Sequence, residues 1–118
     1  MGRPEKFLPL TPTVFEILLA LADGQRHGYA IILEVERRTE GGVKLRPGSL
    51  YRALHRLIRQ GLILESEERP DEPFDDERRR YYSLTGLGRQ VARAEARRLA
   101  RAVAGARQKR LLKPGEVK

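Results

Sequence analysis

The spacing of apolar residues divides this chain of 118 residues into three short helical segments, two short strands and one long helix. Apolar side chains recur every three or four residues over about 12–22, 27–39 and 47–60, which predicts three amphipathic helices. Thr11-Pro12 indicates the start of the first helix, and Thr13 with Glu16 offers a second, capping-box interpretation of the same start. Residues 1–10 are predicted to form a loose arm.

The pattern changes after Gly61. Residues 62–66 and 79–84 indicate two strands, joined by a long loop rich in proline and acidic residues. A last helix is predicted from Thr85 to about Leu112. The predicted fold is therefore mainly α with a small β-hairpin: a winged helix-turn-helix domain over 1–84, followed by a long C-terminal helix and basic tail over 85–118.

Charge is unevenly distributed along the chain. Residues 85–118 hold ten basic and two acidic residues, which accounts for the whole net charge of +8. Residues 44–59 hold basic side chains and no carboxylate, whereas residues 65–77 hold eight carboxylates and one arginine. Positive segments of this kind attract phosphates, so nucleic acid is an expected partner.

Composition argues against several other classes of protein. The chain has no Cys, hence no disulfide framework and no thiolate zinc site. The longest apolar run, 17–22, is far shorter than the roughly 20 residues of a membrane span, and no signal peptide is indicated. Two His, no Asn and no nucleotide-binding glycine motif leave little catalytic chemistry. We expect a cytoplasmic protein that is not an enzyme and needs no cofactor or metal.

The third helical segment has an apolar face and a basic face. Leu50, Leu54 and Leu57 share one side, and the opposite side carries basic residues at i, i+3, i+4 and i+7. In a winged helix-turn-helix the third helix lies in the DNA major groove, and the hairpin lies beside the backbone. The residues expected to face DNA on this basis are Lys44, Arg46, Ser49, Tyr51, Arg52, His55, Arg56, Arg59, Arg78, Arg79 and Arg80.

A solvated surface helix is the alternative explanation of this basic face. A face that serves stability alone usually pairs Glu with Lys or Arg at i, i+4. The absence of carboxylates from the segment favours DNA.

Five motifs occur in order along the chain: Leu10-Thr11; His27-Gly28-Tyr29; Gly48-Ser49-Leu50-Tyr51; Leu54-His55-Arg56-Leu57 with Gly61-Leu62-Ile63; and Arg80-Tyr81-Tyr82-Ser83-Leu84-Thr85-Gly86-Leu87-Gly88. Together, over about residues 8–92, they resemble the PadR family of bacterial transcriptional regulators. The resemblance implies a dimeric winged-helix repressor acting on a pseudo-palindromic operator in double-stranded DNA. It implies DNA contacts from Ser49, Tyr51 and Arg52 and from Arg78–Arg80, the basic part of the hairpin or wing. It also implies a phosphate contact from Tyr29 and close packing at Gly28. His27 is expected to be a local cap.

The last helix is expected to join two copies of the chain into a homodimer. Its apolar stripe is too long and too rich in alanine to be buried against one small domain. The predicted interface residues are Leu87, Val91, Ala94, Leu99, Ala102 and Val103. Two-fold symmetry would place two recognition helices about 34–36 Å apart. The arginine-rich face (Arg89, Arg93, Arg97 and Arg101) is either the solvated side of this helix or a nucleic-acid surface.

Three further points stay open at this stage. A small basic RNA- or ribosome-associated protein and a protein-binding winged-helix adaptor are the alternative functions; the first lacks aromatic stacking residues and the second lacks exposed apolar anchors. The acidic loop tip, 71–77, is expected to be solvated, and folding onto basic residues or holding a divalent cation through Asp71, Asp75, Asp76 and Glu77 are its alternatives. A small-molecule effector is unknown.

Overall fold

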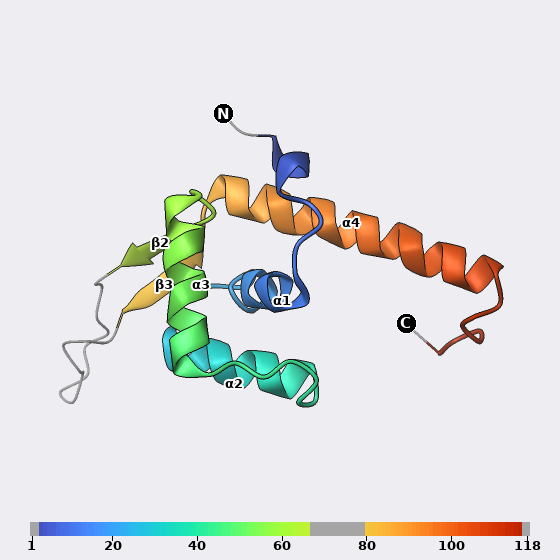
Figure 1. Ribbon diagram of the computed structural model, residues 1–118, viewed down its shortest axis with the longest axis horizontal. Helices are drawn as coiled ribbons and strands as arrows, with labels where there is room; N and C mark the ends of the chain where they lie inside the picture. Colours follow the sequence, from blue (N-terminus) through green and yellow to red (C-terminus); the bar gives the residue numbers. More distant parts are fainter. Residues whose placement is uncertain (1–2, 67–79, 117–118) are drawn as a thin grey trace.

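The computed structural model describes residues 3–66 and 80–116, which form a helical body with a small sheet at one side (Figure 1). The helices are η1 (Pro4–Phe7, a 3₁₀ helix), α1 (Pro12–Ala20), α2 (Gly28–Arg38), α3 (Pro47–Arg59) and α4 (Gly86–Gln108). The strands are β1 (Arg26–His27), β2 (Ile63–Ser66) and β3 (Tyr81–Leu84). This confirms the predicted class, a mainly α winged-helix fold.

The core is built from the apolar faces of the helices. Ile17, Leu18, Ile31, Leu50 and Leu54 are fully buried. α1 packs against α2 and α4, and α2 packs against α3. The apolar stripe predicted for α3 therefore anchors that helix in the core and leaves its other face outside.

Polar side chains cap the N-termini of three helices. The Thr11 hydroxyl accepts a hydrogen bond from Val14 N at 3.2 Å, so the alternative capping box at Thr13 is wrong. His27 caps α2, because its Nδ1 accepts from Ala30 N at 3.3 Å, as expected. Thr85 caps α4 in the same way, and its hydroxyl also donates to the Gly61 carbonyl at 2.6 Å. Thr85 thereby ties the end of α3 to the start of α4.

The sheet has three antiparallel strands in the order β1-β3-β2. The hairpin pairs Ile63 with Leu84 and Ser66 with Tyr81. β1, which pairs with β3, was not predicted, because two residues are too few to show a strand period.

The N-terminal segment is not the loose arm that the sequence suggested. η1 packs against α4, and Phe7, Leu8 and Leu10 pack against the core. Leu10 N also donates a hydrogen bond to Glu95 Oε2 of α4 at 3.1 Å. Prolines on both sides of a short apolar run gave no recurring pattern from which this packing could be predicted.

α4 lies on the body with its first half and extends beyond it with its second half (Figure 1). Val91, Ala92 and Glu95 are buried, and a Cβ at Gly88 would overlap the Leu62 carbonyl oxygen, so α4 approaches that backbone closely. The helix ends at Gln108 rather than near Leu112, and Arg110 follows it with a φ of 64°. Within the described residues, no helix has the length and apolar character that crossing a membrane requires.

Candidate nucleic-acid interface

The outer face of α3 is basic and exposed. Arg52, His55, Arg56 and Arg59 are all exposed, and no ion pair joins them to any of residues 3–66 or 80–116. Leu50, Ala53, Leu54 and Leu57 hold the opposite face in the core. Four cationic or titratable groups are therefore presented on a rigid helix with their hydrogen-bond donors available to an anionic partner.

The start of α3 is fixed by a reciprocal hydrogen-bond pair. Arg46 N donates to Ser49 Oγ at 3.2 Å, and Ser49 Oγ donates to the Arg46 carbonyl at 3.1 Å. The Ser49 hydroxyl is thus a structural cap as well as a predicted DNA contact. The free backbone N–H groups of this first turn favour an anion, because a helix N-terminus carries partial positive charge.

Tyr51 lies across the N-terminus of α2. A Cβ at Gly28 would come closer to the hydroxyl and ring of Tyr51 than van der Waals contact permits. The close packing expected at Gly28 is therefore confirmed, and the residue packed against this glycine is Tyr51. Tyr51 remains 42% exposed and Tyr29 is 63% exposed, so both phenol groups are available at the junction of α2 and α3.

Tyr82 of β3 is buried, and it pairs with Arg26 of β1, the strand that leads into α2. Burial, with a smaller contribution from the negative charge of Glu65, raises the pKa of Tyr82 to about 12. The phenol therefore stays neutral over the physiological range.

Three arginines were predicted to make the wing basic, and the structure describes one of them, Arg80. Arg80 is exposed, and its Nε lies 3.2 Å from Glu65 Oε2 on the neighbouring strand, so part of its charge is offset. Arg78 and Arg79 lie outside the described residues, as do the acidic residues at 71–77. Lys44 and Arg46, just before α3, are exposed.

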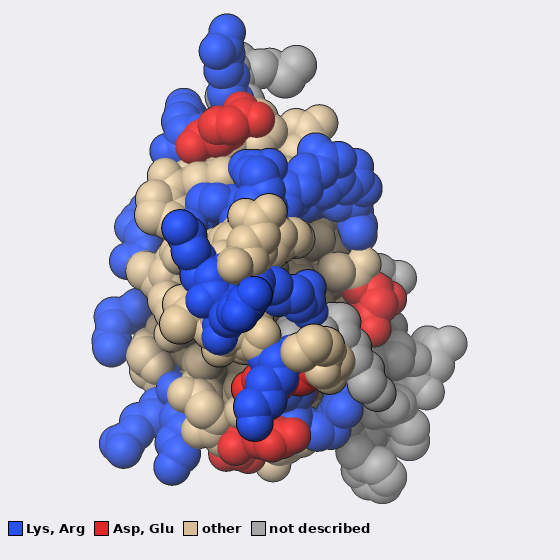
Figure 2. All heavy atoms as spheres, turned by 90° about the vertical axis from the view of Figure 1, so that its right-hand side faces the viewer, with Lys and Arg blue, Asp and Glu red and all other residues tan. Residues whose placement is uncertain are grey.

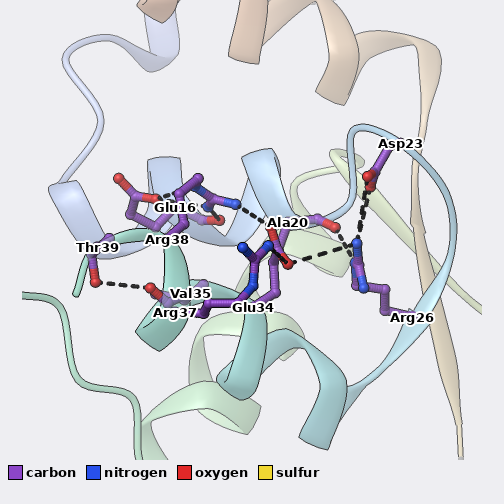
Figure 3. A network of polar contacts seen from close by, with 9 residues as sticks. All are labelled: Glu16, Ala20, Asp23, Arg26, Glu34, Val35, Arg37, Arg38 and Thr39. Carbon is purple, nitrogen blue, oxygen red and sulfur yellow. Dashed lines mark hydrogen bonds and ion pairs between the residues drawn. The ribbon is translucent and has the colours of Figure 1, made fainter. Parts of the chain in front are cut away.

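A network of ion pairs, not singled out from the sequence, holds α1 and α2 together behind the site (Figure 3). Arg38 donates to Glu16 Oε1 and to Glu34 Oε2, each at 2.7 Å, and also to the Glu16 carbonyl at 3.1 Å. Arg37 donates to Glu34 Oε1 at 2.7 Å, and this bond is the main reason why the pKa of Glu34 is lowered. The i, i+3 and i, i+4 spacing of Glu34 with Arg37 and Arg38 was the available signal, whereas the contact of Arg38 with Glu16, 22 residues away, had none.

Arg26 extends this network to the sheet. Its Nε donates to the Ala20 carbonyl at the end of α1, at 2.6 Å, and its guanidinium also pairs with Asp23. The arginines of this network are therefore committed to carboxylates and carbonyls within the chain, unlike those of α3.

A hollow of about 240 Å³ separates the N-terminal segment from the second half of α3. Its lining is mostly apolar, and the exposed side of α3 contributes Arg56 and Gln60 to it. The lining residues are Phe7, Pro9, Leu10, Thr11, Val14, Arg56, Leu57, Gln60 and Leu62. The N-terminal segment thus borders one of the cations predicted to face DNA.

The residues predicted for a dimer interface fall into two groups. Val91 is fully buried within the core of its own chain, so its assignment to an interface is wrong: no surface of this side chain is left for a partner. Leu87 and Ala94 are half-buried, and Leu87 packs on the core. Leu99, Ala102 and Val103 lie on the second half of α4, where Leu99 and Val103 are half-buried and Ala102 is exposed.

Glu95 lies on the buried side of α4, and its burial was not predicted from the sequence. It accepts hydrogen bonds from Arg98 at 2.6 and 2.9 Å and from Leu10 N. The bond from Arg98 is the main cause of its lowered pKa. Its apolar neighbours in the helical pattern gave no sign that a carboxylate would be buried there.

This fold, with a basic helix face beside a two-stranded wing, defines the class of winged-helix DNA-binding proteins. Residues 17–94 match the family described as "Transcriptional regulator PadR-like family". The chain belongs to this family, whose members are DNA-binding transcriptional regulators rather than enzymes.

Three similar proteins illustrate the relationship. The transcriptional regulator Rv3488 of Mycobacterium tuberculosis is 41% identical over 93 residues, covering 75% of this chain and 79% of that protein. An uncharacterized 37.1 kDa protein in transposon TN4556 of Streptomyces fradiae is 42% identical over 85 residues, or 72% of this chain, and the match spans 22% of that longer protein. The structure of Bacillus subtilis PadR in complex with operator DNA has a TM-score of 0.60 at 20% identity, covering 71% of this chain and 46% of that chain.

Proposed function

We propose that the chain is a sequence-specific regulator that binds a pseudo-palindromic operator as a homodimer and represses transcription. The observation that carries this proposal is the outer face of α3, where exposed cations have no carboxylate partner in the described part of the chain. Elsewhere in the same body, at α2, arginines of the same type are held by carboxylates. A basic face without such partners suits a polyanion.

The side chains divide into those that read bases and those that hold the backbone. Tyr51 and Arg52, with Ser49, lie near the N-terminus of α3, the part of a recognition helix that reaches base edges in the major groove. The remaining candidates contact phosphates and set the register of the protein on the duplex. They are Tyr29, Lys44, Arg46, His55, Arg56, Arg59 and the wing arginines Arg78, Arg79 and Arg80. The fold shared with a regulator solved on operator DNA supports this arrangement.

The second half of α4 supplies the surface for a second copy. Leu99, Ala102 and Val103 continue the line of the buried residues along α4, whose second half extends beyond the body. Ala102 is exposed, and the other two remain partly exposed, so a second copy could cover all three. Residues 85–118 would then be the dimerisation segment and residues 1–84 the DNA-binding domain. A dimer of this kind would act in the cytoplasm, the compartment that holds the DNA of the bacteria in which this family is known.

A salt titration with two duplexes tests the proposal. One duplex comes from upstream of the protein's own gene and the other has the same composition in scrambled order. We expect a preference of roughly a thousandfold or more for the first, with two chains bound per site. Equal affinities that fall steeply with salt would contradict sequence-specific binding, since they require only a basic protein and a polyanion.

A further inference from the structure

The arginines of α4 form a second basic face that the proposed operator contact does not use. α4 carries six arginines and one glutamate, 6 − 1 = +5, and its glutamate is paired with Arg98 on the buried side. Arg93, Arg97 and Arg101 are exposed and make no ion pair with any residue in 3–66 or 80–116. Figure 2, which faces the far end of α4, shows lysine and arginine side chains gathered over much of this side of the molecule.

These arginines point away from both the core and the stripe proposed for dimerisation. Two positions along an α-helix correspond to about 200° of rotation. Arg93 and Arg97 each lie two positions from a buried residue, Val91 and Glu95 respectively. Arg101 lies two positions from both Leu99 and Val103. The arginine face therefore stays accessible when the opposite stripe is covered by a second copy.

The position of α4 separates this face from the operator surface. α4 crosses the body at the end of α3 that is remote from Pro47, whereas the predicted base contacts lie near Pro47 (Figure 1). A single straight duplex along the N-terminal half of α3 and the wing would leave the arginine face unoccupied. Two-fold symmetry would provide two such faces per dimer.

We propose that Arg93, Arg97 and Arg101 bind the phosphate backbone of a second DNA duplex, so that one dimer bridges two duplex segments. The inference rests on the proposed function for the first duplex. Arginines at i, i+4 intervals on a straight helix offer charge and hydrogen-bond donors to phosphates, and no side chain of this face is proposed to contact base edges. The contact should therefore be independent of DNA sequence and sensitive to salt. DNA already held by α3 supplies further duplex at high local concentration.

The residues between these arginines disfavour a lipid bilayer as the partner. Ala96, Ala100 and Ala104 share the arginine face, and alanine has too little apolar surface to anchor a helix in a membrane interface. The same small residues allow a duplex backbone to approach α4 closely.

A two-duplex capture assay with the full chain tests this inference. An immobilised duplex bearing the specific site is loaded with protein, and a fluorescent duplex of unrelated sequence is then added at several salt concentrations. The variant R93Q/R97Q/R101Q should bind the first duplex within about twofold of the unmodified chain and capture about tenfold less of the second. Its logarithmic salt slope for second-duplex capture should be smaller by about three, one for each phosphate contact removed.

The variant K6Q/K109Q/K113Q is the matched control, because it removes three exposed charges outside the arginine face. It should capture the second duplex within about twofold of the unmodified chain. Equal losses in both variants would overturn the inference, as would undiminished capture by R93Q/R97Q/R101Q. Equal capture of duplex RNA or of anionic phospholipid vesicles would also overturn it. An unmodified chain that binds the first duplex but not the second overturns this inference alone, whereas one that does not prefer the specific duplex contradicts the proposed function.

Discussion

α2 and α3 carry similar arginines in opposite circumstances. On α2, Arg37 and Arg38 donate short hydrogen bonds to Glu34 and Glu16, and the network joins two helices. On α3, Arg52 and Arg56 are exposed and have no carboxylate partner among the described residues. Arginines on neighbouring helices thus hold the frame in one place and, in the proposed function, bind DNA in the other. The neighbouring carboxylates, not the arginines themselves, distinguish the two roles.

The largest expected effect comes from removing a base-reading cation on α3. Arg52→Ala should weaken specific operator binding by about 1–3 kcal/mol, roughly five- to 150-fold, because bidentate contacts to a base edge are lost. Its stability should change by no more than about 0.5 kcal/mol, since Arg52 is exposed and unpaired within the described chain. Fluorescence anisotropy with the operator and thermal unfolding would measure the two effects. Undiminished operator affinity would contradict the assignment of α3 as the recognition helix.

The next largest effect on operator binding is expected at the contact between Gly28 of α2 and Tyr51 of α3. Gly28→Ala should displace Tyr51 and weaken operator binding about tenfold, because the added Cβ occupies the space of the phenol. In the background of Tyr51→Ala, where that space is empty, Gly28→Ala should change operator affinity much less. A double-mutant cycle on DNA affinity measures this coupling. Additive effects would show that Gly28 acts independently of Tyr51.

The paired arginines of α2 should affect stability more than binding. Arg38→Gln should lower the Tm by about 5 °C, because partly buried carboxylates lose charged hydrogen-bond partners. Operator affinity of the folded variant should stay within about threefold of the unmodified chain. Thermal unfolding by circular dichroism, followed by anisotropy well below the Tm, would check both values. A large loss of operator affinity without a loss of stability would contradict the claim that the arginines of α2 hold the frame and do not bind DNA.

The smallest expected effect is a dependence of stability on acid. The pKa values of Glu34 and Glu95 are lowered in the folded chain, mainly by hydrogen bonds from Arg37 and Arg98. A lowered folded-state pKa stabilises the protein above the unfolded-state value, near 4.5, and this contribution is lost as the pH falls through the folded-state pKa. Unfolding in denaturant between pH 7 and pH 3 should show this decline, and Glu95→Gln should make it shallower. An identical pH profile for Glu95→Gln would contradict the role of that carboxylate.

Periodicity predicted the helices well because each has a continuous apolar face. Leu50, Leu54 and Leu57 defined α3 and its outer face at once. The short elements gave no such signal: β1 has two residues, and η1 is one turn between prolines. Their placement depends on tertiary packing against β3 and α4, which a local pattern does not encode.

The candidate interface was partly predictable for the same reason. Residue types and spacing pointed to the cations of α3, but the contact of Tyr51 with Gly28 and the burial of Tyr82 come from the packing of distant segments. For Val91 the pattern was visible, but the prediction drawn from it was wrong. The sequence predicts one interface along the whole apolar stripe of α4, whereas the first half of this stripe is buried in the chain's own core and its second half extends outside.

NMR chemical shifts would map operator binding directly onto the residues of the protein. With one duplex per dimer, we expect the largest backbone amide shifts on residues 49–56, with further shifts at Tyr29 and Arg80. The amides of the ion-pair network on α2, residues 34–38, should move little. Large shifts confined to α1, or to residues 34–38 with α3 unchanged, would contradict the claim that the unpaired basic face of α3 is the DNA-binding surface.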